Sequence, residues 1–161
     1  MLADMPHGCK TFIDSNIFIY HFLDLSEICT AFLERVNAHE IHGFTSEVVL
    51  TEVLHKLMIA EIASNYGISR LEVNRLIKRR PSVISELERC EIAVQEIPKF
   101  DVEVLPLISG AVIESRSLRS EHQLMTRDSI NLFLMRLAGL KDIATNDSDF
   151  SRVPWIKVWR P

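Results

Sequence analysis

Residues Thr11 to Tyr20 read Thr-Phe-Ile-Asp-Ser-Asn-Ile-Phe-Ile-Tyr, and this stretch decides the fold that the sequence predicts. The apolar run 11–13 is typical of a short buried strand. Asp14 ends that run, and the capping residues Ser15 and Asn16 precede a second apolar pattern that predicts a helix. An acid is therefore expected where a strand ends and a helix begins. Ligands of open α/β sheets bind in the crevice at the carboxyl ends of the strands, so Asp14 is our first candidate site residue.

The chain as a whole has the composition of an ordinary globular protein. Its 161 residues fit one domain, 1–161, with a sizeable core, and 47% of them are hydrophobic against 25% charged. No apolar run is long enough to span a bilayer, and residues 1–10 lack the pattern of a secretory leader, so we expect a cytoplasmic location. Three cysteines without CxxC spacing argue against a disulfide framework or a structural zinc site.

The remaining sequence alternates between strand and helix patterns. Expected strands are 11–13, 42–45, 102–105, 142–145 and 156–159; expected helices follow Asp14 and then span 26–37, 46–65, 69–80, 82–97, 109–120 and 126–137. Strands that alternate with helices predict an α/β fold with a parallel sheet covered on both faces. Residues 65–100 form a helical elaboration between the second and third strands. In the helix 26–37 we expect Ile28, Phe32, Leu33 and Val36 to be the buried stripe.

Four acids could each have a plain structural explanation. Asp14 suits a turn between strand and helix, and Glu52 lies four residues before Lys56, the spacing of an exposed ion pair. Asp128 falls in the first turn of its helix, where negative charge is stabilised. Asp147 is a typical turn residue. None of these residues alone indicates a site.

Their joint positions do indicate one. Asp14 and Asp147 follow two different strands, on the side where ligands are expected. Glu52 lies early on a helix in an otherwise apolar stretch, and Asp128 begins the helix that leads to the last acidic turn. Convergent carboxylates repel one another unless a cation neutralises them, and oxygen ligands suit Mg²⁺ or Mn²⁺. Two such ions about 4 Å apart can clamp the attacking and leaving oxygens of a phosphoryl displacement.

Four segments of the sequence resemble, in order, the motifs of PIN-domain ribonucleases. They are Phe-Ile-Asp-Ser-Asn-Ile-Phe (12–18), Thr-Glu-Val (51–53), Thr-Arg-Asp-Ser (126–129) and Ala-Thr-Asn-Asp-Ser-Asp-Phe (144–150). The resemblance covers nearly the whole chain and is nearest to the toxin components of VapBC-type toxin–antitoxin pairs. It implies a three-layer α/β/α fold with a parallel sheet of five short strands. It also implies Mg²⁺- or Mn²⁺-dependent endonucleolytic cleavage of RNA, commonly by a homodimer, and inhibition by an antitoxin protein.

The resemblance also assigns roles to individual residues. The acids that it implies as metal ligands and catalytic residues are Asp14, Glu52, Asp128 and Asp147, with Asp149 as an auxiliary ligand. The polar residues Ser15, Asn16 and Thr145 would support them by orienting the carboxylates. Basic residues gather at 75–80 and 116–127, mostly as solvated helix faces, and the candidates for holding an RNA backbone are Arg79, Arg119 and Arg127. The net charge of −4 argues against strong non-specific binding to nucleic acid, although local arrangement matters more than the sum.

Two other functions remain open at this point. Asp14 could act as the covalent nucleophile of a phosphatase. Haloacid-dehalogenase-type phosphatases have a second aspartate two residues after the nucleophile, where this chain has Asn16. The fold could instead serve as a non-catalytic platform for RNA or protein, although degenerate relatives usually lose acids and this chain keeps all four.

Overall fold

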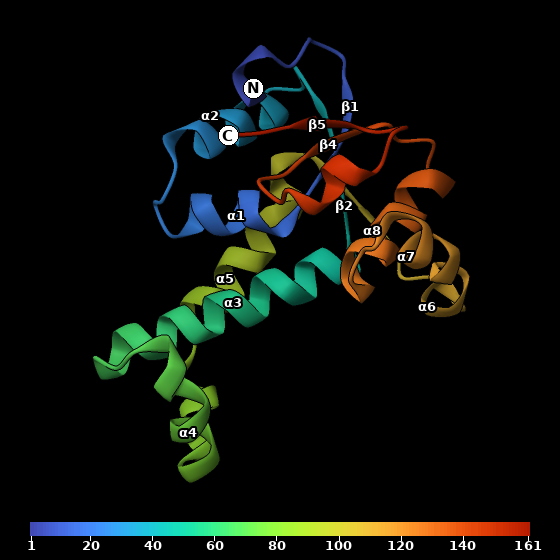
Figure 1. Cartoon of the computed structure of the whole chain (residues 1–161). Coiled ribbons are helices and arrows are strands. Elements are labelled where there is room, and N and C mark those ends of the chain that lie inside the picture. The colour runs from blue at the N-terminus through green and yellow to red at the C-terminus, as the bar shows by residue number, and fades with distance from the viewer.

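Five short strands form one parallel sheet in the order β3-β2-β1-β4-β5 (Figure 1). The computed structural model describes residues 1–161. The strands are β1 (Lys10–Ile13), β2 (His42–Ser46), β3 (Val102–Leu105), β4 (Asp142–Ala144) and β5 (Lys157–Trp159). All neighbouring pairs are parallel, so the five carboxyl ends lie at one edge of the sheet. This arrangement confirms the parallel sheet that the sequence predicts.

Helices cover both faces of the sheet and make the fold a three-layer α/β/α sandwich. The helices are α1 (Ser15–Phe22), α2 (Glu27–Asn37), α3 (Glu47–Tyr66), α4 (Arg70–Arg79), α5 (Arg89–Glu96), α6 (Ala111–Glu114), α7 (Arg116–His122) and α8 (Thr126–Leu137). α1, α2, α3 and α5 pack together on one side, and α6, α7 and α8 pack on the other (Figure 1). The chain reverses direction across the sheet between β3 and β4. Because right-handed crossovers in one direction place their helices on one face, this reversal allows the later helices to cover the other face. None of the helices combines the length and apolar character that a bilayer span requires.

Most predicted helix boundaries are confirmed, because they are set by local caps. The Ser26 and Ser46 side chains accept hydrogen bonds from N–H groups in the first turns of α2 and α3. Ser69 and Glu72 form the expected capping box at the start of α4. Gly67 ends α3 in the left-handed conformation with φ of +60°, which a side chain would disfavour.

Two predicted helices are wrong in detail. The span 82–97 is not continuous: a 3₁₀ turn, η2 (Pro81–Glu86), precedes α5, and a second one, η3 (Ile97–Phe100), follows it. The buried Glu61 carboxylate on α3 caps α5 from a distance, because it accepts hydrogen bonds from the N–H groups of residues 88–90. The predicted helix 109–120 is divided at Ser115 into α6 and α7.

In α2, Cys29 is buried and Ile28 is exposed, so the buried stripe predicted for this helix is wrong at Ile28.

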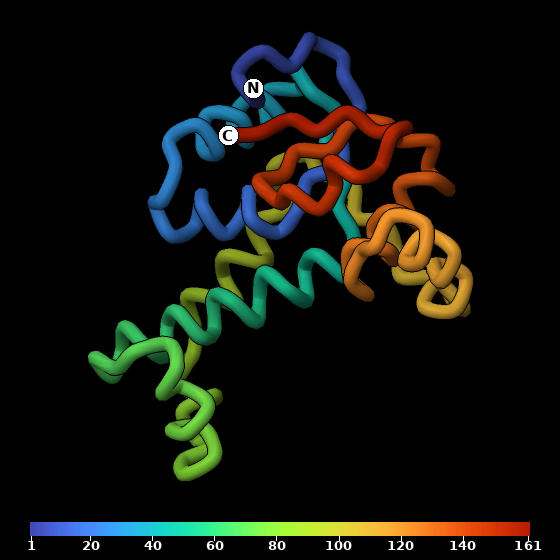
Figure 2. Tube along the Cα trace, viewed as in Figure 1, coloured from blue at the N-terminus to red at the C-terminus, as the bar shows by residue number.

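The helical elaboration extends away from the sheet. α3 has 20 residues, and its carboxyl-terminal half leads to α4 and η2, which Figure 2 shows as a projecting arm. The amino-terminal half of α3 lies close to the sheet, and α3 contacts α8 there. One helix therefore carries Glu52 near the sheet edge and the arm at its other end.

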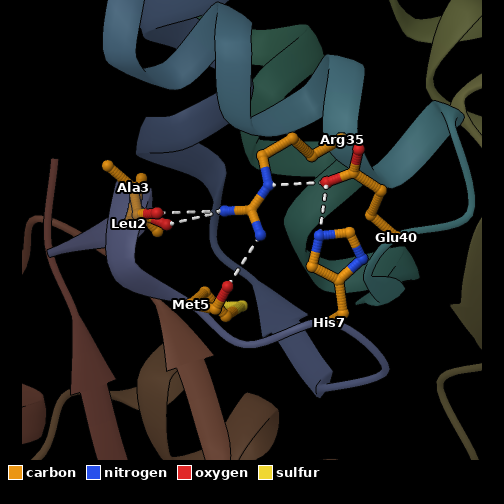
Figure 3. Close-up of polar contacts among 6 residues, drawn as sticks. All are labelled: Leu2, Ala3, Met5, His7, Arg35 and Glu40. Carbon is orange, nitrogen blue, oxygen red and sulfur yellow. Dashed lines mark hydrogen bonds and ion pairs between the residues drawn. The ribbon is translucent and has the colours of Figure 1, made fainter.

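Arg35 on α2 ties the amino-terminal segment to the body of the fold (Figure 3). Its Nη1 donates to the carbonyl oxygens of Leu2 and Ala3, each at 3.3 Å, and its Nη2 donates to that of Met5 at 2.7 Å. Its Nε donates to the Glu40 carboxylate at 3.0 Å. These contacts hold the buried Leu2 and Met5 side chains in the core.

We predict that Arg35→Ala lowers the free energy of unfolding by about 1–2 kcal/mol, because it removes charge-assisted hydrogen bonds to three carbonyls. Urea denaturation measures the loss, and hydrogen exchange should show faster exchange at the Leu2 amide, which bonds the Arg160 carbonyl at 2.7 Å. Arg70→Ala, a change at an exposed α4 residue, is the matched control. Unchanged stability and exchange in Arg35→Ala would contradict this role.

Candidate active site

Asp14 lies at the end of β1 and forms the N-cap of α1. Its Oδ1 accepts the Ser15 N–H at 2.7 Å. Its Oδ2 accepts the Asn16 side-chain amide and the Thr145 hydroxyl, each at 2.6 Å. Burial raises the pKa of Asp14 above its usual value, and the hydrogen bonds from Thr145 and Ser15 oppose that rise. Of the three predicted supporting residues, Asn16 and Thr145 therefore contact the first acid through their side chains, and Ser15 contacts it through its backbone N–H.

Thr145 connects β1 to β4 at the point where the sheet order reverses. Besides donating to Asp14, its hydroxyl oxygen accepts the Asn16 amide at 3.0 Å and the Asp147 N–H at 2.9 Å. The side-chain oxygen of Asn16, Oδ1, accepts the backbone N–H of Asn146 at 2.9 Å. The crevice beside a topological switch point is where open α/β sheets bind ligands. The fold thus places Asp14 and Asp147 beside this switch point, where they follow the neighbouring strands β1 and β4.

Glu52 and Asp128 approach the same crevice from two helices. Glu52 lies in the second turn of α3, and Asp128 in the first turn of α8. Burial, and after it the charges of Asp14, Asp147 and Glu52, raise the pKa of Asp128 to about 6. Part of this rise comes from the charges of the other three acids, which therefore lie within electrostatic reach of Asp128.

A buried hydrogen bond fixes the two helices that carry these acids. The Ser46 hydroxyl caps α3 and donates to Asn131 Oδ1 on α8 at 2.7 Å. Asn131 lies one turn after Asp128, and both Ser46 and Asn131 are buried. The sequence analysis did not assign Ser46 or Asn131 to the site. The one available signal was an amide inside the otherwise apolar stretch 130–135 of α8.

The remaining predicted residues lie in different places. Asp149 pairs with Arg152. Arg119 donates hydrogen bonds to Ser115, Ser129 and the Val112 carbonyl. Its guanidinium therefore holds α7 against α8, and we do not assign Arg119 to the site. Arg79 lies on the projecting arm. Arg127 does lie at the acid cluster: its Nη1 is 2.8 Å from Glu52 Oε1, and this pair replaces the Glu52–Lys56 pair considered from the sequence.

The four acids suit a hard divalent cation by donor type, because all their ligand atoms are carboxylate oxygens. Their repulsion is also the electrostatic signature of a site that a cation would stabilise. No three Asp, Glu, His or Cys side chains are close enough, as they stand, to hold one ion. The pairing of Glu52 with Arg127 contributes to this open arrangement, since that carboxylate is turned to a guanidinium.

Sheet order and acid cluster together define an α/β/α domain of the PIN type. The PIN domain sequence profile matches residues 11–156, and the chain belongs to this family. It is 28% identical over 149 residues to Ribonuclease VapC2 of Methanocaldococcus jannaschii, with 92% of each protein covered. These comparisons confirm the family that the sequence motifs indicated.

Solved structures share the same fold. One is VapBC2 from Rickettsia felis bound to a promoter DNA fragment, with a TM-score of 0.60, 14% identity, and 94% of this chain and 98% of that chain covered. Another is VapC20 of Mycobacterium tuberculosis, a toxin that cleaves the sarcin–ricin loop, with a TM-score of 0.60, 16% identity, and 94% and 99% covered. A toxin–antitoxin complex from Klebsiella pneumoniae has a TM-score of 0.55, 17% identity, and 91% and 95% covered. At these identities the likeness shows the fold.

We predict that Thr145→Val lowers the free energy of unfolding by about 2–3 kcal/mol, because Asp14, Asn16 and Asp147 each lose a partner for a polar group. Thr145→Ser keeps the oxygen and should stay within about 1 kcal/mol of the parent. Chemical denaturation of the two variants compares them directly. A loss in Thr145→Ser with none in Thr145→Val would mean that the methyl group, and not the hydroxyl, holds β1 to β4.

Asp128→Asn should stabilise the protein in EDTA at pH 7.5 by about 1 kcal/mol, a value discounted for partial solvent exposure. The folded-state pKa of Asp128 is raised, to about 6 from 3.8. The ionised form therefore costs stability above pH 6, and this cost disappears as the pH falls toward 4. Urea denaturation at pH 7.5 and 4.5 should show a gain at the higher pH and almost none at the lower. A loss of stability at pH 7.5 would identify Asp128 as a structural residue.

Proposed function

We propose that this chain is a metal-dependent endoribonuclease, the toxin of a toxin–antitoxin pair, which hydrolyses RNA phosphodiester bonds in the cytoplasm. The observation that carries the proposal is the convergence of Asp14, Glu52, Asp128 and Asp147 from four separate segments on the switch point of a PIN fold. The name of the relative, Ribonuclease VapC2, supports the same activity. Repulsion among the acids lowers the stability of the folded protein, so we expect such a cluster to be kept only where it binds a ligand.

Each residue has a distinct part in the proposed reaction. Asp14, Glu52, Asp128 and Asp147 would hold Mg²⁺ or Mn²⁺, in a two-ion arrangement, with Asp149 as a more distant acid. When bound, the ions supply Lewis acidity that stabilises charge developing on the phosphate and its leaving oxygen. The hydroxyl of Thr145 and the amide of Asn16 keep the Asp14 carboxylate in one orientation. Ser15 contributes its backbone N–H to the same carboxylate.

The contacts of Asp14 argue against a phospho-enzyme. Both oxygens of Asp14 accept hydrogen bonds, and the position two residues later holds Asn16, whose amide is bonded to Asp14 and Thr145. A carboxylate nucleophile of this kind needs a nearby acid to protonate the leaving group, and Asn16 cannot supply that proton. Asp14 Oδ1 accepts only the Ser15 N–H and keeps a lone pair for a cation. We therefore place Asp14 among the ligands.

Two partners belong to the proposal. The solved VapBC structures are complexes of toxin and antitoxin, and we propose an antitoxin as the regulatory partner of this chain and a second copy as its dimer mate. A small neighbouring reading frame with a DNA-binding amino-terminal segment would supply such an antitoxin.

We predict that the purified protein cleaves single-stranded RNA with Mn²⁺ or Mg²⁺ and is inactive in EDTA. The products should carry 5′-phosphate and 3′-hydroxyl ends, because water and not the ribose hydroxyl attacks the phosphate. Asp14→Asn and Asp128→Asn should each lower the cleavage rate by about 100-fold or more, the loss typical of a removed charge-stabilising group. Gel analysis of labelled RNA, with ligation of the product ends, measures both.

Glu91→Gln is the matched control, because this exposed acid on α5 lies outside the proposed site and the variant should retain full activity. Cyclic-phosphate ends, or metal-independent cleavage, would overturn the mechanism. A labelled aspartyl-phosphate on Asp14 would favour a phosphatase. A folded protein that neither binds Mn²⁺ nor cleaves RNA at enzyme excess would favour a non-catalytic module.

A further inference from the structure

A cavity of about 430 Å³ opens beside the acid cluster. Its walls come from the amino-terminal half of α3, from the segment after β3 and from the first turns of α8. Glu52 and Arg127 belong both to the cavity wall and to the acid cluster, so the two features share a border. This volume lies within the range of sites that bind small molecules or single nucleotide units.

The cavity wall combines three kinds of chemistry. Val48, Leu107 and Ile130 provide apolar surface. His55, one turn after Glu52 on α3, adds a planar ring, and the Arg127 guanidinium adds a positive charge. A nucleotide presents complementary groups, because its base has two apolar faces and its phosphate is an anion. Stacking on planar side chains and cation contacts to phosphate are the usual means of holding single-stranded RNA.

The other cavities lie away from the acid cluster. One of about 370 Å³ beside α2 is lined by Phe32 and Arg35, but that guanidinium is already bonded to Glu40 and to three backbone carbonyls. The one between α1, α3 and α5, of about 190 Å³, contains Glu61, which already caps α5.

The cavity at the β2–β3 edge, of about 230 Å³, contains two acids, Asp101 and Glu103, and no lysine or arginine. The cavity beside Glu52 also has two acids in its wall, Glu47 and Glu52, but it includes the Arg127 guanidinium. None of the other three includes an acid of the cluster. Position and charge together single out the cavity beside Glu52.

Arg127 lies at the border between the cavity and the acid cluster, where its guanidinium can bind either of two partners. Its guanidinium is 54% exposed and paired with Glu52, which is 16% exposed. A divalent cation and a guanidinium cannot both neutralise one carboxylate without repelling each other. When Glu52 binds a divalent cation, Arg127 is therefore free to turn to an anion at the cavity mouth. Arginine binds phosphate oxygens through paired N–H groups.

We propose that this cavity is the subsite for the nucleotide adjoining the cleaved phosphate, with His55 stacking on the base and Arg127 moving from Glu52 to the phosphate. The proposal rests on the ribonuclease function proposed above. It gives this chain a means of preferring some bases over others at the cleavage position. It also couples cation binding to RNA binding through one side chain.

The test measures equilibrium binding of fluorescein-labelled A8, C8, G8 and U8 RNA by anisotropy, in saturating Ca²⁺ and in EDTA. His55→Ala should weaken the tightest complex by about 5- to 30-fold and reduce the differences between the four RNAs. His55→Phe keeps a planar ring and should stay within about threefold of the parent. Arg127→Ala should weaken all four by a similar factor, about 3- to 10-fold, and more strongly in Ca²⁺ than in EDTA.

A second readout needs no RNA. Calorimetric titration with Mn²⁺ alone should show tighter binding to Arg127→Ala than to the parent, because Glu52 loses a competing cation, and unchanged binding to His55→Ala. Arg75→Ala on the exposed arm is the matched control for Arg127→Ala, and His39→Ala, in the loop after α2, is the matched control for His55→Ala. Both controls should leave both measurements unchanged. Circular dichroism of each variant checks its folding.

The outcomes separate the subsite from the function. If the parent cleaves RNA but His55→Ala and Arg127→Ala bind all four RNAs as the parent does, the subsite is overturned and the nuclease stands. If Arg79→Ala on the arm weakens binding and Arg127→Ala does not, the RNA lies along α4 and the subsite is again overturned. If the parent never cleaves, yet both variants lose RNA affinity as described, the subsite stands and the catalytic function fails.

Discussion

The hydrogen bond from the Thr145 hydroxyl to the Asp14 carboxylate is the contact on which the rest of the site depends. A buried carboxylate is costly unless donors surround it, and here the donors come from both sides of the switch point. Thr145 also accepts the Asp147 N–H, so the same oxygen that satisfies the first acid positions the last one. The same hydroxyl therefore joins the end of β1 to the end of β4 and positions both Asp14 and Asp147.

Near this hydrogen bond, repulsion among the acids lowers the stability of the folded protein. Asp128 has a pKa of about 6 because it is buried among three other acids, and its ionised form disfavours the folded state near neutral pH. A protein selected for stability alone would not keep such a cluster, since replacing any one acid relieves the repulsion. The Ser46–Asn131 hydrogen bond resists that repulsion by holding α3 against α8. The strain thus remains at the site instead of separating the helices.

The sequence predicted what depends on local pattern, and it failed where distant residues decide. Parallel strands, caps at Ser26, Ser46 and Ser69, and the αL glycine at Gly67 are all local signals, and the structure confirms them. The sequence analysis expected four acids to converge because they follow strands or lie early in helices and because the family resemblance assigns them; in the structure the charges of Asp14, Glu52 and Asp147 do act on Asp128. The break before α5 could not be predicted, because its cap, Glu61, lies on another helix. The pairing of Arg127 with Glu52 joins residues 75 positions apart in the chain, and no periodicity in either helix indicates it.

The overall charge of −4 and the proposed RNA substrate are compatible only if positive charge is placed locally. The acid cluster by itself repels a phosphodiester, so a substrate must meet cations before it meets carboxylates. In the arrangement that we propose, Arg127 satisfies this requirement with one side chain, because it pairs with Glu52 when no ion is bound and would turn to the cavity mouth when one is. An arginine fixed permanently on the phosphate side would leave the acids unpaired, and one fixed permanently on Glu52 would exclude the ion. The position at the border between cluster and cavity avoids both, which is why we place the recognition of RNA there and not on the basic arm.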